Sequence, residues 1–209
     1  CAAFKFRNAG QVCLSPNRIF VQEGIFDQFV EHFVSATGRM KVGNGMDASV
    51  QMGPLTNVRR LEAAQRFVEE ALGVGATVRS GGRRIGVRGY FFEPTVLTNV
   101  RDSASIMYEE PFCPVAPIVP FSDLDDVVRR ANAVDYGLAA YAFTRSIRRA
   151  ASITEAFDAG WIGINHFAPA LAELPMGGTK QSGIGYEGGP EGLDAYMHIK
   201  SLNQALPIE

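Results

Sequence analysis

The sequence has few cysteines and no excess of charge of either sign. Three cysteines, Cys1, Cys13 and Cys113, occur in 209 residues, and their scattered spacing excludes a disulfide framework and paired metal ligands. We therefore expect no metal site and a reducing, cytoplasmic location. Twenty basic and 22 acidic residues give a net charge of −2, so nucleic acid is not an expected partner. Small molecules and other protein chains remain.

Long hydrophobic runs are also absent. The segment VAPIVPF at residues 115–121 is far shorter than the roughly 20 apolar residues that span a bilayer. The sequence therefore predicts no transmembrane helix and no membrane partner. The first residues, CAAFKFR, lack the apolar stretch and cleavage site of a signal peptide and do not begin with Met. They are typical of the middle of a helix, so we expect the chain to begin inside a longer protein.

The apolar residues follow helical spacing in some segments of the chain and form short strand-like runs in the segments between them. Helical spacing occurs in residues 25–34 and 57–72, and a further helix follows Ser122, which is a candidate N-cap. Between these helices lie short runs rich in β-branched and aromatic residues. This alternation is typical of βαβ units and predicts an α/β fold with a mostly parallel sheet covered by helices. The strand candidates are residues 18–22, 94–100, 139–143 and 160–165.

The last part of the chain has a different composition. Residues 174–193 are dense in glycine and show no period, which indicates an ordered loop around a site. Residues 195–204, AYMHIKSLNQ, predict a lone strand. A lone strand needs a pairing partner outside this sheet, because its backbone groups require hydrogen bonds.

Cys13 is the strongest candidate for a catalytic residue, as a nucleophilic thiol. It lies in FRNAGQVCLSPNR, where Gly10 permits a tight turn and Pro16 disfavours a helix before it, so we expect a loop that exposes the thiol to backbone N–H groups. Such donors lower the pKa of a thiol and stabilise an oxyanion on a carbonyl that the sulfur attacks. From these residues alone, a buried apolar cysteine remains the alternative.

Seven segments together resemble the NAD(P)-dependent aldehyde dehydrogenases. FRNAGQVCLSPNRIFVQ is similar to the active-site segment of that family, in which a Gly-Gln-x-Cys cysteine attacks the aldehyde. Six further segments follow in the family's order and cover essentially the whole chain. Within the family, KFRNAGQ and GYEGGPEGLDAY resemble the succinate semialdehyde dehydrogenase group. The six segments are QMGPL at 51–55, YFFEPTVLTNV at 90–100, EEPFCPVAPIVPF at 109–121, YGLAAYAFTR at 136–145, GWIGIN at 160–165 and PMGGTKQSGIGYE at 175–187.

The resemblance implies roles for five residues. Cys13 corresponds to the nucleophile, Glu110 to the glutamate that holds the nicotinamide ribose, and Phe112 to the aromatic residue beside the nicotinamide. Arg7 corresponds to the arginine that binds a substrate carboxylate, and Met176 to an aromatic residue at the substrate entrance. The implied reaction is oxidation of an aldehyde, such as succinate semialdehyde or a related semialdehyde, to an acid with NAD or NADP. It proceeds through a cysteine thiohemiacetal and thioester.

The resemblance also implies a domain organisation. The family's dinucleotide-binding, general-base and oxyanion-hole segments precede the cysteine and do not occur in this chain. We therefore expect residues 1–185 to form a catalytic domain that is incomplete at its N-terminus, without the upstream cofactor-binding domain, and to be inactive alone. Residues 186–209 are expected to form a tail with an oligomerisation strand. The expected partners are a small-molecule aldehyde and, for the full-length protein, further copies in a dimer or tetramer.

Some residues depart from the family pattern. The group's carboxylate-binding serine falls near Ala170 or Leu171, neither of which has a side-chain donor, and Cys113 replaces a glycine. Two other readings stay open at this point. One is a non-catalytic folding or assembly module that keeps the fold. The other is a thiol protease or acyl transferase, although no motif places any of the three histidines as the activating base.

Overall fold

The computed structural model describes residues 1–167 and 171–205. Its main sheet has four strands in the order β1-β4-β3-β2. Strand β4 pairs in parallel with β1 and with β3, whereas β2 runs antiparallel to β3. The predicted α/β fold with a mostly parallel sheet is therefore confirmed. The strands are β1 (Ile19–Gln22), β2 (Thr77–Ser80), β3 (Thr95–Thr98) and β4 (Val115–Phe121).

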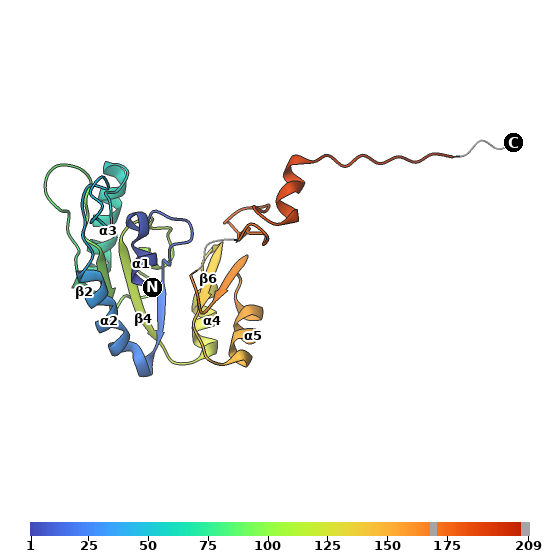
Figure 1. The fold of residues 1–209 in the computed structure, drawn as a ribbon. Coiled ribbons are helices and arrows are strands. Elements are labelled where there is room, and N and C mark those ends of the chain that lie inside the picture. Colours follow the sequence, from blue (N-terminus) through green and yellow to red (C-terminus); the bar gives the residue numbers. More distant parts are fainter. Residues whose placement is uncertain (168–170, 206–209) are drawn as a thin grey trace.

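Helices α2 and α3 confirm the helical spacing of residues 25–34 and 57–72, and a short helix, α1, forms at the start of the chain (Figure 1). Helix α2 contacts β1, β2 and β3, and α1 packs against α2. Helix α3 begins after Asn57, whose side chain accepts a hydrogen bond from the backbone N–H of Arg60 at 3.1 Å. Its buried residues recur every three or four positions, which places one face in the core. The helices are α1 (Ala2–Lys5), α2 (Phe26–Gly38) and α3 (Val58–Gly73), with 3₁₀ turns η1 (Arg7–Gly10), η2 (Glu23–Ile25) and η3 (Ser105–Met107).

A smaller parallel pair of strands, β6 and β7, lies beside helices α4 and α5 (Figure 1). The predicted capping role of Ser122 is wrong. The carboxylate of Asp123 caps α4 instead by accepting the backbone N–H of Asp126 at 2.9 Å, while the Ser122 hydroxyl donates to Asp123. Asp123 is one residue closer to the first turn, so only its side chain reaches that N–H. The elements are β6 (Ala139–Ala142), β7 (Trp161–Ile164), α4 (Leu124–Asn132) and α5 (Ile147–Ala156).

Two arginines join α4 to the main sheet. The guanidinium of Arg18 donates to the carbonyl oxygens of Arg130 and Ala131, both at 2.8 Å. Arg130 in turn pairs with Asp102 at 2.7 Å. Both guanidinium groups lie over the ring of Phe20, at 5.6 and 4.9 Å from its centre. The last carbonyls of α4 are thereby satisfied by a cation that is fixed next to β1.

The glycine-rich region contains a short strand, β8, that the sequence did not predict. Strand β5 (Tyr136–Gly137) pairs antiparallel with β8 (Thr179–Lys180). Lys180 anchors this region, because its ammonium group donates to the carbonyls of Asn132 and Val134 and pairs with Asp158 at 2.9 Å. The region is therefore tied to the loops that flank α4 and α5.

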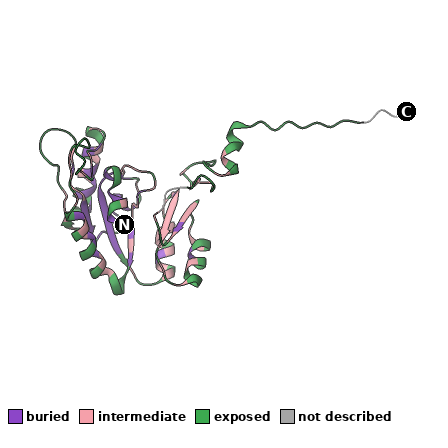
Figure 2. Cartoon of the chain, viewed as in Figure 1, coloured by how far each residue is buried: buried purple, intermediate pink, exposed green. Residues whose placement is uncertain are grey.

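Beyond β8, the chain leaves the folded body (Figure 1) and is largely exposed (Figure 2). The predicted strand at 195–204 is wrong for its first two residues, which lie in the 3₁₀ helix η4 (Pro190–Tyr196). Residues 197–205 form no strand with the part of the chain that the structure describes, so pairing with another chain stays a prediction. In residues 1–167 and 171–205, no helix has the length and apolar character to cross a bilayer. The exposed apolar residues of this tail are Ile184, Tyr186, Leu193, Tyr196, Met197, Ile199 and Leu202.

Candidate active site

Cys13 lies in a turn between η1 and β1, and its side chain is exposed. The backbone N–H of Ser15 donates to the carbonyl of Val12 at 2.9 Å, which closes the turn around the cysteine. The buried Ser15 hydroxyl donates to the carbonyl of Lys5 at 3.1 Å. The turn is thus held from beneath while the thiol faces outward, so the predicted loop position is confirmed and the buried alternative is wrong.

The backbone before Cys13 is left-handed over three successive residues. The φ angles are +50° at Asn8, +54° at Ala9 and +73° at Gly10. This region is unfavourable for alanine. Two hydrogen bonds compensate: the Asn8 amide donates to the Gln11 carbonyl at 3.0 Å, and the Gln11 amide donates back to the Asn8 carbonyl at 2.9 Å. Strained backbone of this kind concentrates at functional sites, where surrounding contacts hold it.

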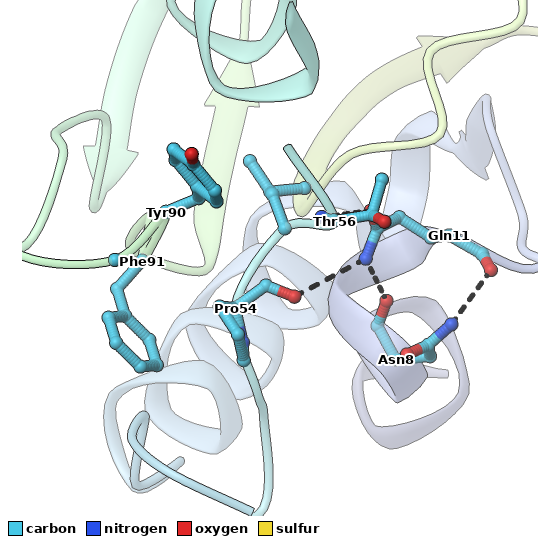
Figure 3. A pocket seen from close by; sticks show the side chains of 8 residues that line it. Asn8, Gln11, Pro54, Thr56, Tyr90 and Phe91 are labelled. Atoms are coloured by element: carbon cyan, nitrogen blue, oxygen red, sulfur yellow. Dashed lines mark hydrogen bonds between the residues drawn. The ribbon is translucent and has the colours of Figure 1, made fainter. Parts of the chain in front are cut away.

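Gln11 also connects the Cys13 segment to the residues that lead into α3. Its side-chain oxygen accepts the backbone N–H of Thr56 at 2.9 Å, and its amide donates to the Pro54 carbonyl at 3.4 Å (Figure 3). These groups line a pocket of about 560 Å³ that Tyr90 and Phe91 also border (Figure 3). The residues that line this pocket do not include Cys13.

Glu110 and Phe112 lie on the loop between η3 and β4. Glu110 is exposed, whereas Phe112 is half-buried and has a φ of +40°. This loop touches the Cys13 segment at Gly10. A Cβ placed on Gly10 would overlap the carbonyl oxygen of Cys113 and lie 2.7 Å from its carbonyl carbon. Glycine is therefore required at this crossing, and the structure brings the exposed thiol and the Glu110 loop onto neighbouring segments.

Cys113, at this crossing, and Lys5 are both fully buried. In the described part of the chain, the Lys5 ammonium nitrogen has no hydrogen-bond partner. Burial lowers the pKa of Lys5 to about 8, with a smaller opposing effect from Cys113. Burial raises the pKa of Cys113 to about 11. A buried thiol that stays protonated is a poor nucleophile, so Cys113 is not a candidate for thiol chemistry.

The two predicted substrate residues occupy different surroundings. Arg7 is exposed at the start of η1, six positions before Cys13. Met176 is half-buried and pairs through its backbone with Glu187, at 2.7 and 2.8 Å. Of the two candidate serine positions, Leu171 is exposed and Ala170 lies outside the described residues. No hydrogen bond within the described residues joins the Arg7 or Met176 side chain to the Cys13 turn.

Sequence reasoning missed an aromatic cluster next to the Cys13 turn. The Tyr141 hydroxyl, on β6, donates to the carbonyl of Leu14 at 2.9 Å. Burial raises the pKa of Tyr141, and the negative charge of a Cys13 thiolate adds to the rise. The available signal was the aromatic content of two strand candidates, residues 139–143 and 160–165, which contain Tyr141 and Trp161 and pair in parallel as β6 and β7. The rings around Tyr141 are Phe4 at 5.7 Å, Trp161 at 5.5 Å and Phe167 at 4.9 Å.

The fold is an α/β scaffold that exposes a cysteine a few residues after a strained stretch of backbone. The sequence profile of the aldehyde dehydrogenase family matches residues 1–202, and the chain belongs to that family. It is 46% identical over 198 residues to a probable succinate-semialdehyde dehydrogenase, NADP(+), of Sinorhizobium fredii. It is also 42% identical over 196 residues to a 3-sulfolactaldehyde dehydrogenase of Pseudomonas putida. The alignments cover 95% and 94% of this chain and 40% of each relative.

Solved structures agree with the fold. An aldehyde dehydrogenase of Bacillus cereus in complex with NAD+ superposes with a TM-score of 0.91 at 38% identity, over 96% of this chain and 41% of that chain. The chain thus spans about two fifths of the relatives it matches. These findings confirm the family and the α/β fold expected from the ordered segments. The roles of the five site residues and the division at residues 185 and 186 stay predictions.

Proposed function

We propose that this chain supplies the thiol-bearing part of an enzyme that oxidises an aldehyde to a carboxylic acid with NAD+ or NADP+. The observation that carries the proposal is the crossing of Gly10 and Cys113. It joins the segment of an exposed, turn-held thiol to the loop that bears Glu110 and Phe112. Family membership supports the reaction class. We infer that the activity belongs to the full-length protein and that this chain alone is inactive.

Cys13 is the nucleophile in this proposal. Its thiolate adds to the carbonyl carbon of the aldehyde, the C=O electron pair moves onto oxygen, and backbone N–H groups of the turn stabilise the resulting oxyanion. NAD(P)+, when bound, supplies the acceptor for the hydride that leaves this carbon. Cys13 then holds the acyl group as a thioester. Water hydrolyses the thioester, releasing the acid and restoring the thiol.

The residues of the loop between η3 and β4 fit one end of the cofactor. The exposed carboxylate of Glu110 is an acceptor suited to the two hydroxyls of a ribose. The half-buried ring of Phe112 offers a flat apolar surface to the nicotinamide. Both cofactors share this nicotinamide riboside end, so these two residues serve NAD+ and NADP+ equally. One relative is named for NADP(+) and one solved structure contains NAD+.

The proposed substrate is an aldehyde with an acidic group at its far end, such as succinate semialdehyde. Arg7 is exposed near Cys13 in the sequence, and its planar fork of donors suits an acidic group. The two relatives described above are named for succinate semialdehyde and 3-sulfolactaldehyde, which both carry an acid. Met176 is proposed to border the substrate entrance. The exposed apolar tail is proposed to pair with a second copy, giving a dimer or tetramer of the full-length protein.

Cysteine labelling and mutation test the function together. In the full-length enzyme, Cys13→Ser should abolish aldehyde oxidation while leaving the fold intact, because a serine hydroxyl is far less ionised and less nucleophilic than a thiol. Mass spectrometry after brief iodoacetamide treatment should show Cys13 modified first and protected by aldehyde. Cys1, which is also exposed, serves as the internal control. Residual turnover by Cys13→Ser, or equal labelling of Cys1 and Cys13, would favour a non-catalytic assembly module.

A further inference from the structure

A network of side chains connects helix α3 to the loop that carries Glu110. The guanidinium of Arg66 on α3 forks onto the carboxylate of Glu109, at 2.7 and 3.3 Å. It also pairs with Glu70, one helical turn later, at 3.2 Å. Glu70 in turn accepts a hydrogen bond from the hydroxyl of Ser105 in η3. The network therefore holds both η3 and the residue directly before Glu110.

An aromatic ring also restrains the guanidinium of Arg66, in addition to its two carboxylate partners. Its guanidinium lies over the ring of Phe67, 4.3 Å from the ring centre. The Ser105 hydroxyl lowers the pKa of Glu70, so this partner stays ionised. Side chains that are 41% exposed, as Arg66 and Glu109 are, gain little stability from an ion pair. A bidentate ion pair whose guanidinium stacks on an aromatic ring instead fixes the orientation of the carboxylate, here that of Glu109.

The loop needs such a restraint because it presents two consecutive carboxylates, Glu109 and Glu110. Its ends are held by the backbone: Glu109 N–H donates to the Ser105 carbonyl at 2.9 Å, and the Pro114 carbonyl accepts Thr95 N–H at 2.8 Å. Among the described residues, the Arg66 fork is the side-chain contact that distinguishes one carboxylate from the other. It occupies Glu109 and leaves Glu110 exposed.

We propose that Arg66 is a positioning residue for the cofactor, which fixes Glu109 against α3 so that Glu110 is presented to the nicotinamide ribose. The inference rests on the proposed function, since it assigns the ribose contact to Glu110. It assigns to Arg66 no contact with substrate or with the reacting atoms. Its effect is on cofactor affinity, through the orientation of the loop.

Steady-state kinetics of the full-length enzyme test this role. Arg66→Ala should raise the KM for NAD(P)+ about tenfold while kcat and the aldehyde KM change less than about twofold. Glu109→Gln should raise the KM for NAD(P)+ by the same factor. The double variant should raise this KM no further, because both changes remove the same contact. Arg66→Lys, which keeps the charge without the fork, should restore part of the affinity. Arg79→Ala is the control, since Arg79 is exposed on β2.

Amide hydrogen exchange supplies a readout that needs no activity. Exchange at residues 108–113 should accelerate in Arg66→Ala and stay unchanged in Arg79→Ala. An active Arg66→Ala enzyme with an unchanged cofactor KM overturns the inference alone. A proportional loss of kcat with all substrates, together with lowered thermal stability, also overturns it, because that result describes a structural role. A wild-type enzyme that oxidises no aldehyde overturns the proposed function, while the exchange experiment still decides whether Arg66 holds the loop.

Discussion

Replacing Gly10 with alanine tests the crossing that joins the Cys13 segment to the Glu110 loop. The φ of +73° at Gly10 disfavours any Cβ, which costs about 1 to 2 kcal/mol for alanine. The new Cβ would also overlap the Cys113 carbonyl group, and overpacking of this kind costs about 1 to 3 kcal/mol. We therefore expect Gly10→Ala to lower the free energy of unfolding by about 2 to 5 kcal/mol.

The control for this prediction is Gly86→Ala. Gly86 has a similar φ of +64°, but a Cβ there would meet nothing within 4 Å. Gly86→Ala should lower the free energy of unfolding by the conformational cost alone, about 1 to 2 kcal/mol. Urea denaturation of both variants, followed by circular dichroism, measures the difference. Equal losses in the two variants would refute the reasoning, because the clash with Cys113 would then cost nothing.

Two further predictions concern charged groups near the turn. Arg7→Ala should lower kcat/KM of the full-length enzyme about tenfold for succinate semialdehyde and leave kcat/KM for butanal unchanged, since one charge-assisted hydrogen bond is lost. An unchanged ratio of the two kcat/KM values would show that Arg7 is a surface charge without a role in substrate binding. Burial lowers the pKa of Lys5 in the folded state to about 8, from its ordinary value of 10.5. The unfolded state therefore binds more protons between these two pH values, and stability rises with pH. Unfolding free energies should increase by about 1 kcal/mol from pH 8 to pH 9. This increase should vanish in Lys5→Met, and an identical slope in that variant would show that another group titrates.

Local sequence pattern predicted the elements that are strongly buried. Helix α3 buries five residues at helical spacing, and β3, inside the strand candidate at 94–100, is buried along its whole length, so each has a strong pattern. Helix α5 was missed because Ile153 is its one buried residue and Ile147 is 89% exposed. Strand β2 was missed because it is short and half-exposed on the edge of the sheet. In these cases tertiary contacts, rather than the local pattern, determine the structure.

The candidate site likewise has features that local sequence predicts and contacts that it does not predict. Gly10 and Pro16 were sufficient to predict an exposed turn at Cys13, because turn chemistry is local. The crossing of Gly10 with Cys113 joins residues about a hundred positions apart, and the Tyr141 hydroxyl reaches Leu14 over a separation of 127 residues. No spacing rule reports contacts at such distances. Family resemblance named Glu110 and Phe112, but the pairing of Arg66 with Glu109 required coordinates.

The aromatic cluster has a spectroscopic consequence. Trp161 is the single tryptophan of the sequence, and its indole lies 5.5 Å from the Tyr141 ring, whose hydroxyl is bonded to the residue after Cys13. Tryptophan fluorescence of this chain therefore arises at one residue, in the aromatic cluster that contacts the Cys13 turn through Tyr141. We expect a change at this turn that moves the Tyr141 ring to alter the fluorescence of Trp161.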